Sequence, residues 1–344
     1  MSAPTNAVLP AGSLVLVSGC NGFVGAEIAN QLLASGYRVR GTVRDLQKSA
    51  WVQETFKKTY GAGRFELVKV DNMAEKGSLD EAVKGCAGVI HVASNISFSA
   101  DANVVVNEAI AFTNSALESA AQEASVKRFV STSSGVAVLQ PGDRLNERFD
   151  ITPDTWNEKA VKIAWAPPPY EADRGVWTYA ASKVQAEQAV WKFMKERKPH
   201  FVANTVLTGL VEGAPVDVGK QGYPTSLGFF NALWHGNDAW KVMGPAYMVD
   251  AKDNALLHVA ALLHPDYKQE RVFAYAHVFN WTTTIAMLKK AYPEHQFPDP
   301  PENEGEDLTT VTARPRAEAL LKWFGRPGWR PEEESLREIC DTFA

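Results

Sequence analysis

The chain has 344 residues, of which 45% are hydrophobic and 22% are charged, as in an ordinary globular protein with a sizeable core. This length predicts one large domain accompanied by a smaller one. The formal net charge of −5 argues against a nucleic-acid-binding protein, because such proteins usually present a basic face. No apolar run approaches the ~18 residues that a membrane span needs, and residues 1–12 lack the pattern of a signal peptide. We therefore expect a cytoplasmic protein without membrane segments.

The three cysteines, Cys20, Cys86 and Cys340, are far apart and include no pair at metal-binding spacing. An odd number of widely spaced cysteines is typical of a reducing compartment. We expect no bound metal.

Short apolar runs alternate with helical patterns through the first 134 residues. Helices are expected at 26–36, 78–86 and 103–124, the first ended by Gly36. Ser78 and Glu81 stand at capping-box spacing at the start of the second helix. The apolar runs are read as buried strands at 14–19, 38–44, 64–71, 88–94 and 127–134. Such repeats predict right-handed crossovers, and hence an α/β fold with a doubly wound parallel sheet of the Rossmann type.

The second half of the chain is less regular. Residues 140–175 contain five prolines and are expected to form one long loop with a functional role. The pattern between the sixth strand and Tyr247 is irregular and rich in glycine and aromatic residues. The remaining elements expected are a helix at 178–198, strands at 201–207 and 271–277, and helices at 314–324 and 332–342.

Three glycines follow the first strand, in the segment VSGCNGFVG. They are Gly19, Gly22 and Gly25, spaced GxxGxxG between a predicted strand and a predicted helix. In such a motif the first glycine permits a tight turn, the second a close approach of the pyrophosphate, and the third close packing of helix on strand. Unpaired N–H groups at the helix start favour a phosphate. The segment predicts a dinucleotide site, and glycines that merely form a turn are the alternative.

The end of the second strand indicates which dinucleotide is preferred. An acidic residue there would bind the ribose 2′-hydroxyl and repel a 2′-phosphate, but this strand ends at Arg44. Arg44 can pair with a 2′-phosphate through charge-assisted hydrogen bonds, and Lys48 adds a second positive charge. The sequence therefore predicts NADPH rather than NADH. The preference is weaker if the carboxylate of Asp45 faces the ribose, or if Arg44 is simply solvated.

The second motif is TYAASK, in which Tyr179 and Lys183 share one face of the predicted helix, a turn apart. A Tyr-x-x-x-Lys pair alone is a weak signal. Its position adds weight, because it follows the proline-rich segment and a fifth strand that ends in Ser133-Ser134.

In this order the motifs resemble those of the extended short-chain dehydrogenases/reductases. More narrowly, they resemble the dihydroflavonol-4-reductase-like group, which includes fungal and yeast aldehyde and ketone reductases. The matching segments span most of the chain: VSGCNGFVG, GTVRD, KGCAGVIHVAS, VKRFVSTSSGV, WTYAASKVQAE and GRPGW. The resemblance implies a Rossmann domain, NADPH as the cofactor and a Ser-Tyr-Lys catalytic set.

The resemblance also assigns individual positions. The family's serine corresponds to Ser134, with Ser133 as the alternative, and its adenine contact corresponds to Asp71. The catalytic residues expected are Ser134, Tyr179 and Lys183. The cofactor-binding residues expected are Gly19, Asn21, Gly22, Phe23, Val24, Gly25, Arg44, Lys48, Asp71, Ala93, Ser94, Tyr179, Lys183 and Leu207, with Ala93 and Ser94 near the nicotinamide ribose.

The catalytic roles follow from the chemistry of carbonyl reduction. Hydride transfer to the carbonyl carbon leaves charge on the oxygen, and Tyr179 is expected to donate a proton there. The ammonium of Lys183 favours the phenolate and is expected to lower the pKa of Tyr179, while also binding the nicotinamide ribose. Ser134 is expected to hold the carbonyl oxygen by a hydrogen bond. The predicted reaction is the reduction of an aldehyde, ketone or ketoester to an alcohol.

Departures from the family patterns narrow the substrate and leave other functions open. Leu139 stands five residues after Ser134, where plant dihydroflavonol reductases usually carry Asn or Asp, so a polyhydroxylated flavonoid is disfavoured. The run Val206 to Leu210 lacks the proline often found after the sixth strand. One alternative is a nucleotide-sugar epimerase or dehydratase, against which Arg44 counts. The other is a non-catalytic NADP-sensing protein, against which the Tyr-x-x-x-Lys pair counts.

The segment 222–248 is rich in aromatic residues and is expected to line an apolar substrate pocket. The wall residues expected are Phe98, Trp165, Trp234 and Met243. The alternative places most of this segment in the core of the smaller domain. An apolar pocket favours a carbonyl compound with a hydrophobic arm.

These expectations divide the chain into two parts. Residues 1–200 form an NADP-binding Rossmann domain, to which residues 201–210 and about 250–280 return. Residues 211–344 form a smaller, mixed substrate-binding region. The expected partner is a small-molecule carbonyl substrate, with no nucleic acid and no membrane, and the expected oligomeric state is a monomer or homodimer.

Overall fold

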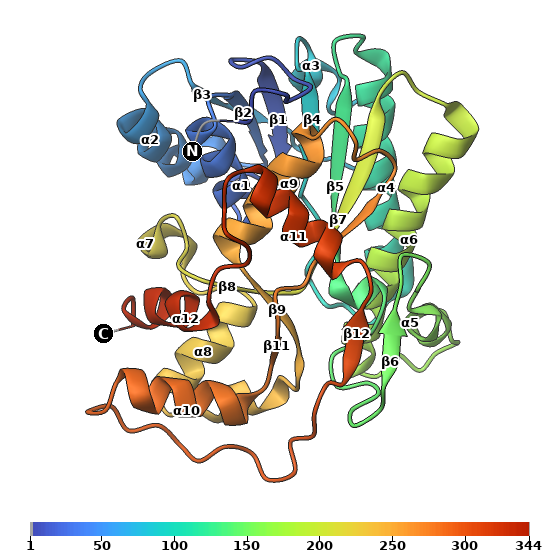
Figure 1. Cartoon of the computed structure of the whole chain (residues 1–344). Helices are drawn as coiled ribbons and strands as arrows, with labels where there is room; N and C mark the ends of the chain where they lie inside the picture. Colours follow the sequence, from blue (N-terminus) through green and yellow to red (C-terminus); the bar gives the residue numbers. More distant parts are fainter. Residues whose placement is uncertain (1–2, 344) are drawn as a thin grey trace.

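A seven-stranded parallel sheet forms the centre of the structure, a computed structural model that describes residues 3–343 (Figure 1). Its strand order is β10-β7-β5-β4-β1-β2-β3, so the crossovers run in both directions from β1. This order confirms the predicted doubly wound sheet of the Rossmann type. The strands are β1 (Leu14–Ser18), β2 (Arg38–Val43), β3 (Phe65–Lys69), β4 (Gly88–His91), β5 (Arg128–Ser134), β7 (Val202–Thr208) and β10 (Arg271–Ala274).

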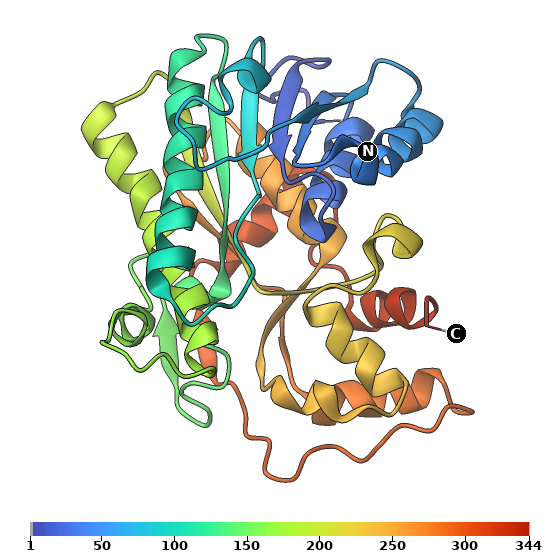
Figure 2. The same cartoon turned by 180° about the vertical axis from the view of Figure 1, so that it is seen from behind.

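Helices cover both faces of the sheet (Figures 1 and 2). Because both faces are buried, successive side chains of one strand enter different cores. In β1, Val15 and Val17 join one hydrophobic core and Leu16 the other. The first core includes residues from α1 (Phe23–Ala34), α2 (Leu46–Tyr60), α9 (Ala251–Leu263) and α11 (Arg314–Trp323). The second includes residues from α3 (Asp80–Val83), α4 (Ala102–Gln122) and α6 (Arg174–Arg197).

A smaller core lies beyond the carboxyl ends of the central strands (Figure 1). It is built on a three-stranded sheet in the order β11-β9-β8. Fully buried aromatic rings fill it, with Phe279 and Trp281 in edge-to-face contact at 4.8 Å between ring centres. Its elements are β8 (Leu210–Glu212), α8 (Ser226–Trp234), β9 (Ala246–Asp250), β11 (His277–Phe279), α10 (Trp281–Ala291) and α12 (Glu332–Cys340).

The proline-rich segment 140–175 is not one long loop, and this prediction was wrong. It contains β6 (Phe149–Ile151), which pairs with β12 (Thr309–Val311), and α5 (Glu158–Ala164). The Asn157 side chain starts α5 by accepting a hydrogen bond from the amide of Ala160 at 3.0 Å. Elements of three and seven residues are too short to show a period in the sequence. Three further short elements are η1 (Gly135–Ala137), α7 (Val218–Gln221) and η2 (Asp238–Val242).

The predicted helix at 78–86 is a single turn, and its capping box does not form. Leu79, not Ser78, occupies the N-cap position of α3. The Ser78 hydroxyl lies 3.2 Å from the hydroxyl of Ser115 and donates to the carbonyl of Met73. A tertiary contact has therefore taken the side chain that the spacing assigned to a local cap.

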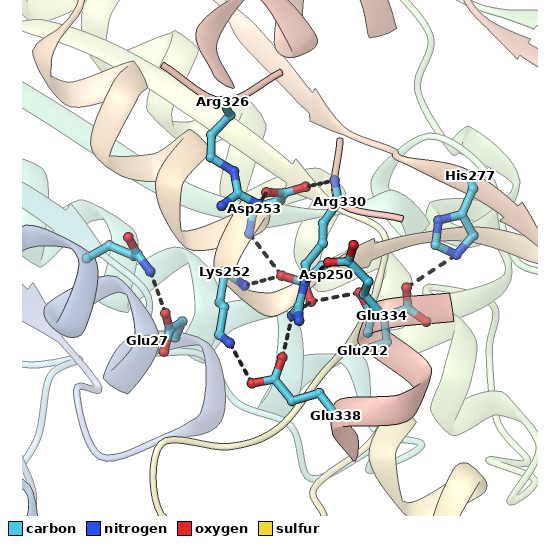
Figure 3. A network of polar contacts seen from close by, with 12 residues as sticks. Glu27, Glu212, Asp250, Lys252, Asp253, His277, Arg326, Arg330, Glu334 and Glu338 are labelled. Atoms are coloured by element: carbon cyan, nitrogen blue, oxygen red, sulfur yellow. Dashed lines mark hydrogen bonds and ion pairs between the residues drawn. The ribbon is translucent and has the colours of Figure 1, made fainter. Parts of the chain in front are cut away.

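Charged side chains connect β9, α9 and α12 beside the smaller core (Figure 3). Arg330 donates to Asp250 at 2.9 Å, and Ser335 donates to the same carboxylate oxygen at 2.8 Å. Lys252 pairs with Glu338 at 2.5 Å.

Within residues 3–343, no helix is long and apolar enough to span a bilayer.

Candidate active site

The glycine-rich turn joins β1 to α1 at the carboxyl edge of the sheet. Gly19 has a φ of +65°, which favours glycine, and its amide donates to the carbonyl of Thr42 on β2. A Cβ on Gly25 would lie 2.3 Å from the carbonyl oxygen of Gly19, so the packing of α1 excludes any side chain there. A Cβ on Gly22 would meet only that same oxygen, at an ordinary 3.4 Å. The chain therefore needs glycine at 19 and 25, whereas Gly22 leaves space open at the start of α1.

The start of α1 has the features of an anion site. Gly22 is the N-cap residue and has no side chain that could cap the helix. The first N–H groups of α1 therefore make no hydrogen bond to an N-cap side chain. Phe23 and Val24 begin the helix directly after it, and the exposed Asn21 precedes it. A pyrophosphate placed there would meet the positive end of the helix dipole.

The carboxyl end of β2 presents positive charge. Arg44 and Lys48 are both exposed there. The Asp45 carboxylate caps α2 by accepting from the amides of Gln47 and Lys48 at 2.9 and 3.0 Å, which lowers its pKa. One oxygen of the Asp45 carboxylate is thus bound by helix amides. This carboxylate is therefore less available to a ribose hydroxyl.

The loop after β4 lies against the glycine turn. The Ser18 hydroxyl accepts hydrogen bonds from the amides of Val92 and Ala93 at 2.9 and 3.1 Å. A Cβ on Gly19 would come within 3.2 Å of Ala93, so the two segments are in contact, with Ser94 next in the chain. This is the switch point between β1 and β4, where ligands of such sheets bind. Asp71 lies after β3, exposed and paired with Lys69 at 2.6 Å.

The structure brings Ser134, Tyr179 and Lys183 together. Ser134 is the last residue of β5, and Tyr179 and Lys183 lie one turn apart on α6. The side chain of Ser134 lies close enough to the Tyr179 hydroxyl to lower its pKa. The Lys183 ammonium lies 5.8 Å from the centre of the Tyr179 ring. All three predicted catalytic side chains therefore converge at one end of the sheet.

Burial raises the pKa of Tyr179, and the nearby Ser134 side chain offsets only part of that shift. The expectation that Lys183 lowers the pKa of Tyr179 was wrong in its net direction, because burial outweighs any such effect. Burial also lowers the pKa of Lys183 to about 8, opposed by the nearby carboxylate of Glu187. A proton therefore stays on the phenol at neutral pH.

The neighbouring serines have different partners. Ser133 is buried, and its hydroxyl donates to Glu187 at 2.7 Å. Ser134 is half-buried, contacts Tyr179 and accepts a long hydrogen bond of 3.4 Å from the amide of Val136. This geometry favours Ser134 over Ser133 as the group that meets a substrate.

A small cavity of about 70 Å³ opens beside Ser134. The Gln140 side-chain oxygen in its wall is buried and has no hydrogen-bond partner among the described residues. Most of these wall residues could not be predicted from the sequence, because the wall is formed by segments that lie far apart in the chain. The lining residues are Ser134, Gly135, Val136, Leu139, Gln140, Pro141, Ile151, Thr208, Gly209, Leu210, Ala246, Tyr247, Tyr275, Asp307 and Thr309. A larger cavity of about 350 Å³, beside β10, contains none of the predicted site residues.

Of the four predicted pocket residues, only Phe98 reaches the catalytic set. Its ring is 42% exposed and lies 4.8 Å from the Tyr179 ring. Trp165 donates to Gln185 at 2.7 Å. Gln185 follows Lys183 by two residues on the helix, so Trp165 lies on the opposite side of α6.

Trp234 and Met243 belong to the smaller core, and neither lines the cavity beside Ser134. Trp234 packs on His295 at 4.0 Å between ring centres, and Met243 is 6% exposed. The alternative reading of the aromatic segment therefore holds for these two residues. Leu207 is fully buried on β7, in a cluster with Phe273 and Tyr275, and its contact with a cofactor stays a prediction.

The glycine turn and the catalytic helix lie within the part of the chain that matches a known family. Residues 15–214, more than half of the chain, match the family described as the NAD dependent epimerase/dehydratase family. The chain belongs to this family. Membership confirms the resemblance to extended short-chain dehydrogenases/reductases.

Individual proteins match this chain over nearly its whole length. Aldehyde reductase 2 of Sporidiobolus salmonicolor is 43% identical over 344 residues, covering 99% of each chain. Ketoreductase adrE of Penicillium rubens is 36% identical over 343 residues, covering 98% of each. The Gre2 protein of Candida albicans, solved in complex with NADPH, shares the fold with a TM-score of 0.80 at 22% identity, over 96% of this chain and 98% of that one.

Proposed function

We propose that the chain is an NADPH-dependent carbonyl reductase that converts aldehydes, ketones or ketoesters into alcohols. The observation that carries the proposal is the convergence of Ser134, Tyr179 and Lys183 at the carboxyl edge of the sheet. The names of its relatives, an aldehyde reductase and a ketoreductase, support the same reaction class.

The dinucleotide site fits NADPH. The space at Gly22 admits a pyrophosphate, and the exposed Arg44 and Lys48 stand where a 2′-phosphate would lie. When bound, NADPH supplies the hydride. Lys183 would hold the nicotinamide ribose, and the loop at Ala93 would border the nicotinamide side.

The chain's own side chains then donate the proton and stabilise the charge that develops. The high pKa of Tyr179 keeps its hydroxyl protonated, so that it can donate a proton to the carbonyl oxygen of the substrate. Ser134 donates a second hydrogen bond to that oxygen as charge develops there. Lys183, with a pKa of about 8, is mostly an ammonium at neutral pH and stabilises the phenolate that remains.

The surroundings of the catalytic set favour a substrate with a hydrophobic arm. Phe98 covers Tyr179, and the cavity wall is mainly apolar. A cytoplasmic location and a monomeric or homodimeric state remain predictions from the sequence.

The test measures loss of NADPH absorbance with an aryl ketone, a β-ketoester, a simple aldehyde and a dihydroflavonol, each repeated with NADH. We expect turnover of ketones or ketoesters with NADPH. Tyr179→Phe should bind NADPH normally but lose at least about a hundredfold in kcat. The control is Tyr223→Phe, which removes a hydroxyl that donates to Thr342 in the smaller core and should keep kcat.

Two outcomes would contradict the proposal. Undiminished turnover by Tyr179→Phe would exclude this tyrosine as the proton donor. Tight NADPH binding without turnover of any carbonyl compound by the unchanged chain would favour the NADP-sensing alternative.

A further inference from the structure

One buried carboxylate projects from the catalytic helix toward the sheet. Glu187 is on α6, one turn after Lys183 and two turns after Tyr179, so the three side chains lie along one side of the helix. Glu187 is 2% exposed. Nothing in the proposed reaction uses it directly.

Three strands of the sheet provide hydrogen bonds to this one carboxylate. Ser133 of β5 and Thr205 of β7 each donate a hydroxyl at 2.7 Å, to different oxygens. Arg271 of β10 donates to both oxygens, at 2.8 and 3.2 Å. Because β10, β7 and β5 are consecutive, Glu187 connects α6 to three of the seven strands of the sheet.

Arg271 is itself fixed on its other side. Its remaining terminal nitrogen donates to the carbonyls of Pro153 and Thr155 at 2.7 and 2.8 Å. The guanidinium lies 3.8 Å from the centre of the Trp156 ring. The position of the Glu187 carboxylate is therefore set by a group that has little freedom to move.

The same carboxylate connects both parts of the catalytic set. Ser133 precedes Ser134 at the end of β5, so the bond to Glu187 fixes the backbone from which Ser134 projects. Tyr179 and Lys183 project from the helix that carries Glu187. We propose that Glu187 is a positioning residue, which holds α6 in register with β5 so that Ser134 meets Tyr179, and whose charge favours the ammonium form of Lys183.

A role in stability alone accounts poorly for this arrangement. Buried ion pairs lose so much solvation that apolar side chains of similar volume often give equal or greater stability. Apolar packing, however, does not fix the rotation and translation of a helix as directional bonds do. Reacting groups must be held to about 0.5 Å for full activity, which directional bonds can achieve.

The charge effect can be assigned because few groups face this pair. They are Arg271 and Tyr275 from the β10 segment, His91 from β4 and Tyr179 from α6 itself. Burial lowers the pKa of His91 to about 4 and raises that of Tyr275 far above neutrality. Lys183, with a pKa of about 8, is thus the member of this group that titrates in mildly alkaline solution.

The first test is Glu187→Gln, which keeps the shape of the side chain and removes its charge. The inference rests on the proposed function, and kcat is followed from pH 6 to 10 with NADPH and a ketone. We expect the alkaline loss of activity to move to lower pH by roughly one unit, because Lys183 loses a nearby negative charge. Glu196→Gln, an exposed glutamate on the same helix, should leave the profile unchanged.

A second pair of variants covers the case in which Glu187→Gln does not fold. Ser133→Ala removes one donor and keeps the carboxylate and its ion pair. We expect kcat to fall about tenfold to a hundredfold, with an unchanged alkaline limb, because Ser134 is less firmly placed. Ser131→Ala, the same change two residues earlier on β5, should keep kcat, since that hydroxyl makes no bond to Glu187.

The outcomes separate this inference from the proposed function. A folded Glu187→Gln with the profile of the unchanged chain, or equal kcat for both serine variants, would overturn the positioning role alone. If the unchanged chain reduces no carbonyl compound, the proposed function fails. In that case NADPH affinity measured by fluorescence over the same pH range still reports the charge of Lys183, and an unshifted curve in Glu187→Gln would overturn the charge effect.

Discussion

A Cβ on Gly25 would lie 2.3 Å from the carbonyl oxygen of Gly19, closer than any side chain can be accommodated against backbone. The middle glycine of the motif, Gly22, has no such restriction, because its Cβ would lie 3.4 Å from the same oxygen. Two glycines of one motif therefore serve different purposes. Gly25 is required by the packing of α1 on β1. Gly22 is expected to be required by a ligand that binds outside the turn.

This difference leads to a prediction for alanine at each position. Gly22→Ala should lower NADPH affinity by at least about tenfold while costing ~1 kcal/mol or less of stability, as an N-cap glycine replaced by alanine. Gly25→Ala should destabilise the chain by about 1–3 kcal/mol, because α1 must shift away from the turn. Fluorescence titration with NADPH and thermal unfolding of both variants check this. Equal effects of the two substitutions on affinity and stability would contradict it.

Arg44 is predicted to select NADPH over NADH. Arg44→Ala should lower kcat/KM with NADPH by about ten- to a hundredfold. It should leave kcat/KM with NADH nearly unchanged, because the lost guanidinium pairs only with the 2′-phosphate, which NADH lacks. Steady-state kinetics with both cofactors give the ratio. Arg38→Ala is the matched control at the opposite end of β2, where the arginine donates to the carbonyl of Gly12. A ratio that is the same in both variants would show that Arg44 is only a solvated surface residue.

The sheet could be predicted from the sequence because its strands are continuous apolar runs. Val15, Leu16 and Val17 are all buried, since each face of β1 meets a different helix layer. Local spacing also predicted that Tyr179 and Lys183 share a helix face, which requires no knowledge of the rest of the fold.

Elements without a one-sided pattern escaped the sequence analysis. All but one residue of α9 are buried, so its sequence has no polar face from which to read a helical period. The run 271–277 was read as one strand, but it supplies β10 to the large sheet and then, after Tyr275 and Ala276, the start of β11 in the small one. A change of sheet within seven residues leaves no mark on hydrophobicity.

The site could be predicted only where local geometry decides it. Whether Ser133 or Ser134 faces the substrate depends on how β5 is oriented against α6, a tertiary relationship. Trp234 and Phe98 are both large aromatic residues, yet one packs in the smaller core and the other covers Tyr179. Composition gives no basis for telling core from pocket.

Phe98 is predicted to influence which carbonyl compounds are reduced. Phe98→Ala should change the ratio of kcat/KM values across a ketone and aldehyde panel by about tenfold, with little change in NADPH affinity, because the ring lies against Tyr179. Trp234→Ala is the comparison. It should destabilise the smaller core by a few kcal/mol and leave substrate ratios intact. Unchanged ratios in Phe98→Ala would remove this residue from the pocket.

Glu332 at the start of α12 is predicted to make stability depend on pH. Burial raises its pKa to about 7, and the nearby Thr284 side chain offsets part of the shift. His277 lies 3.6 Å away and also faces Glu212, beside the network in which Arg330 bridges Asp250 and Glu338 (Figure 3). The Glu332 carboxyl therefore binds a proton more tightly in the folded state than in the unfolded state, whereas burial lowers the pKa of His277 to about 4.

A raised carboxyl pKa stabilises the fold below the unfolded value and loses this contribution as the pH rises through the folded value. Relative to Glu332→Gln, the free energy of unfolding of the unchanged chain should thus fall by on the order of 2 kcal/mol between pH 5 and 8. Urea unfolding at several pH values gives this difference. Glu333→Gln, which alters a surface pair with Arg337 on the same helix, should show a flat difference. A flat difference for Glu332→Gln as well would mean that Glu332 titrates alike in both states and that its burial carries no energetic cost.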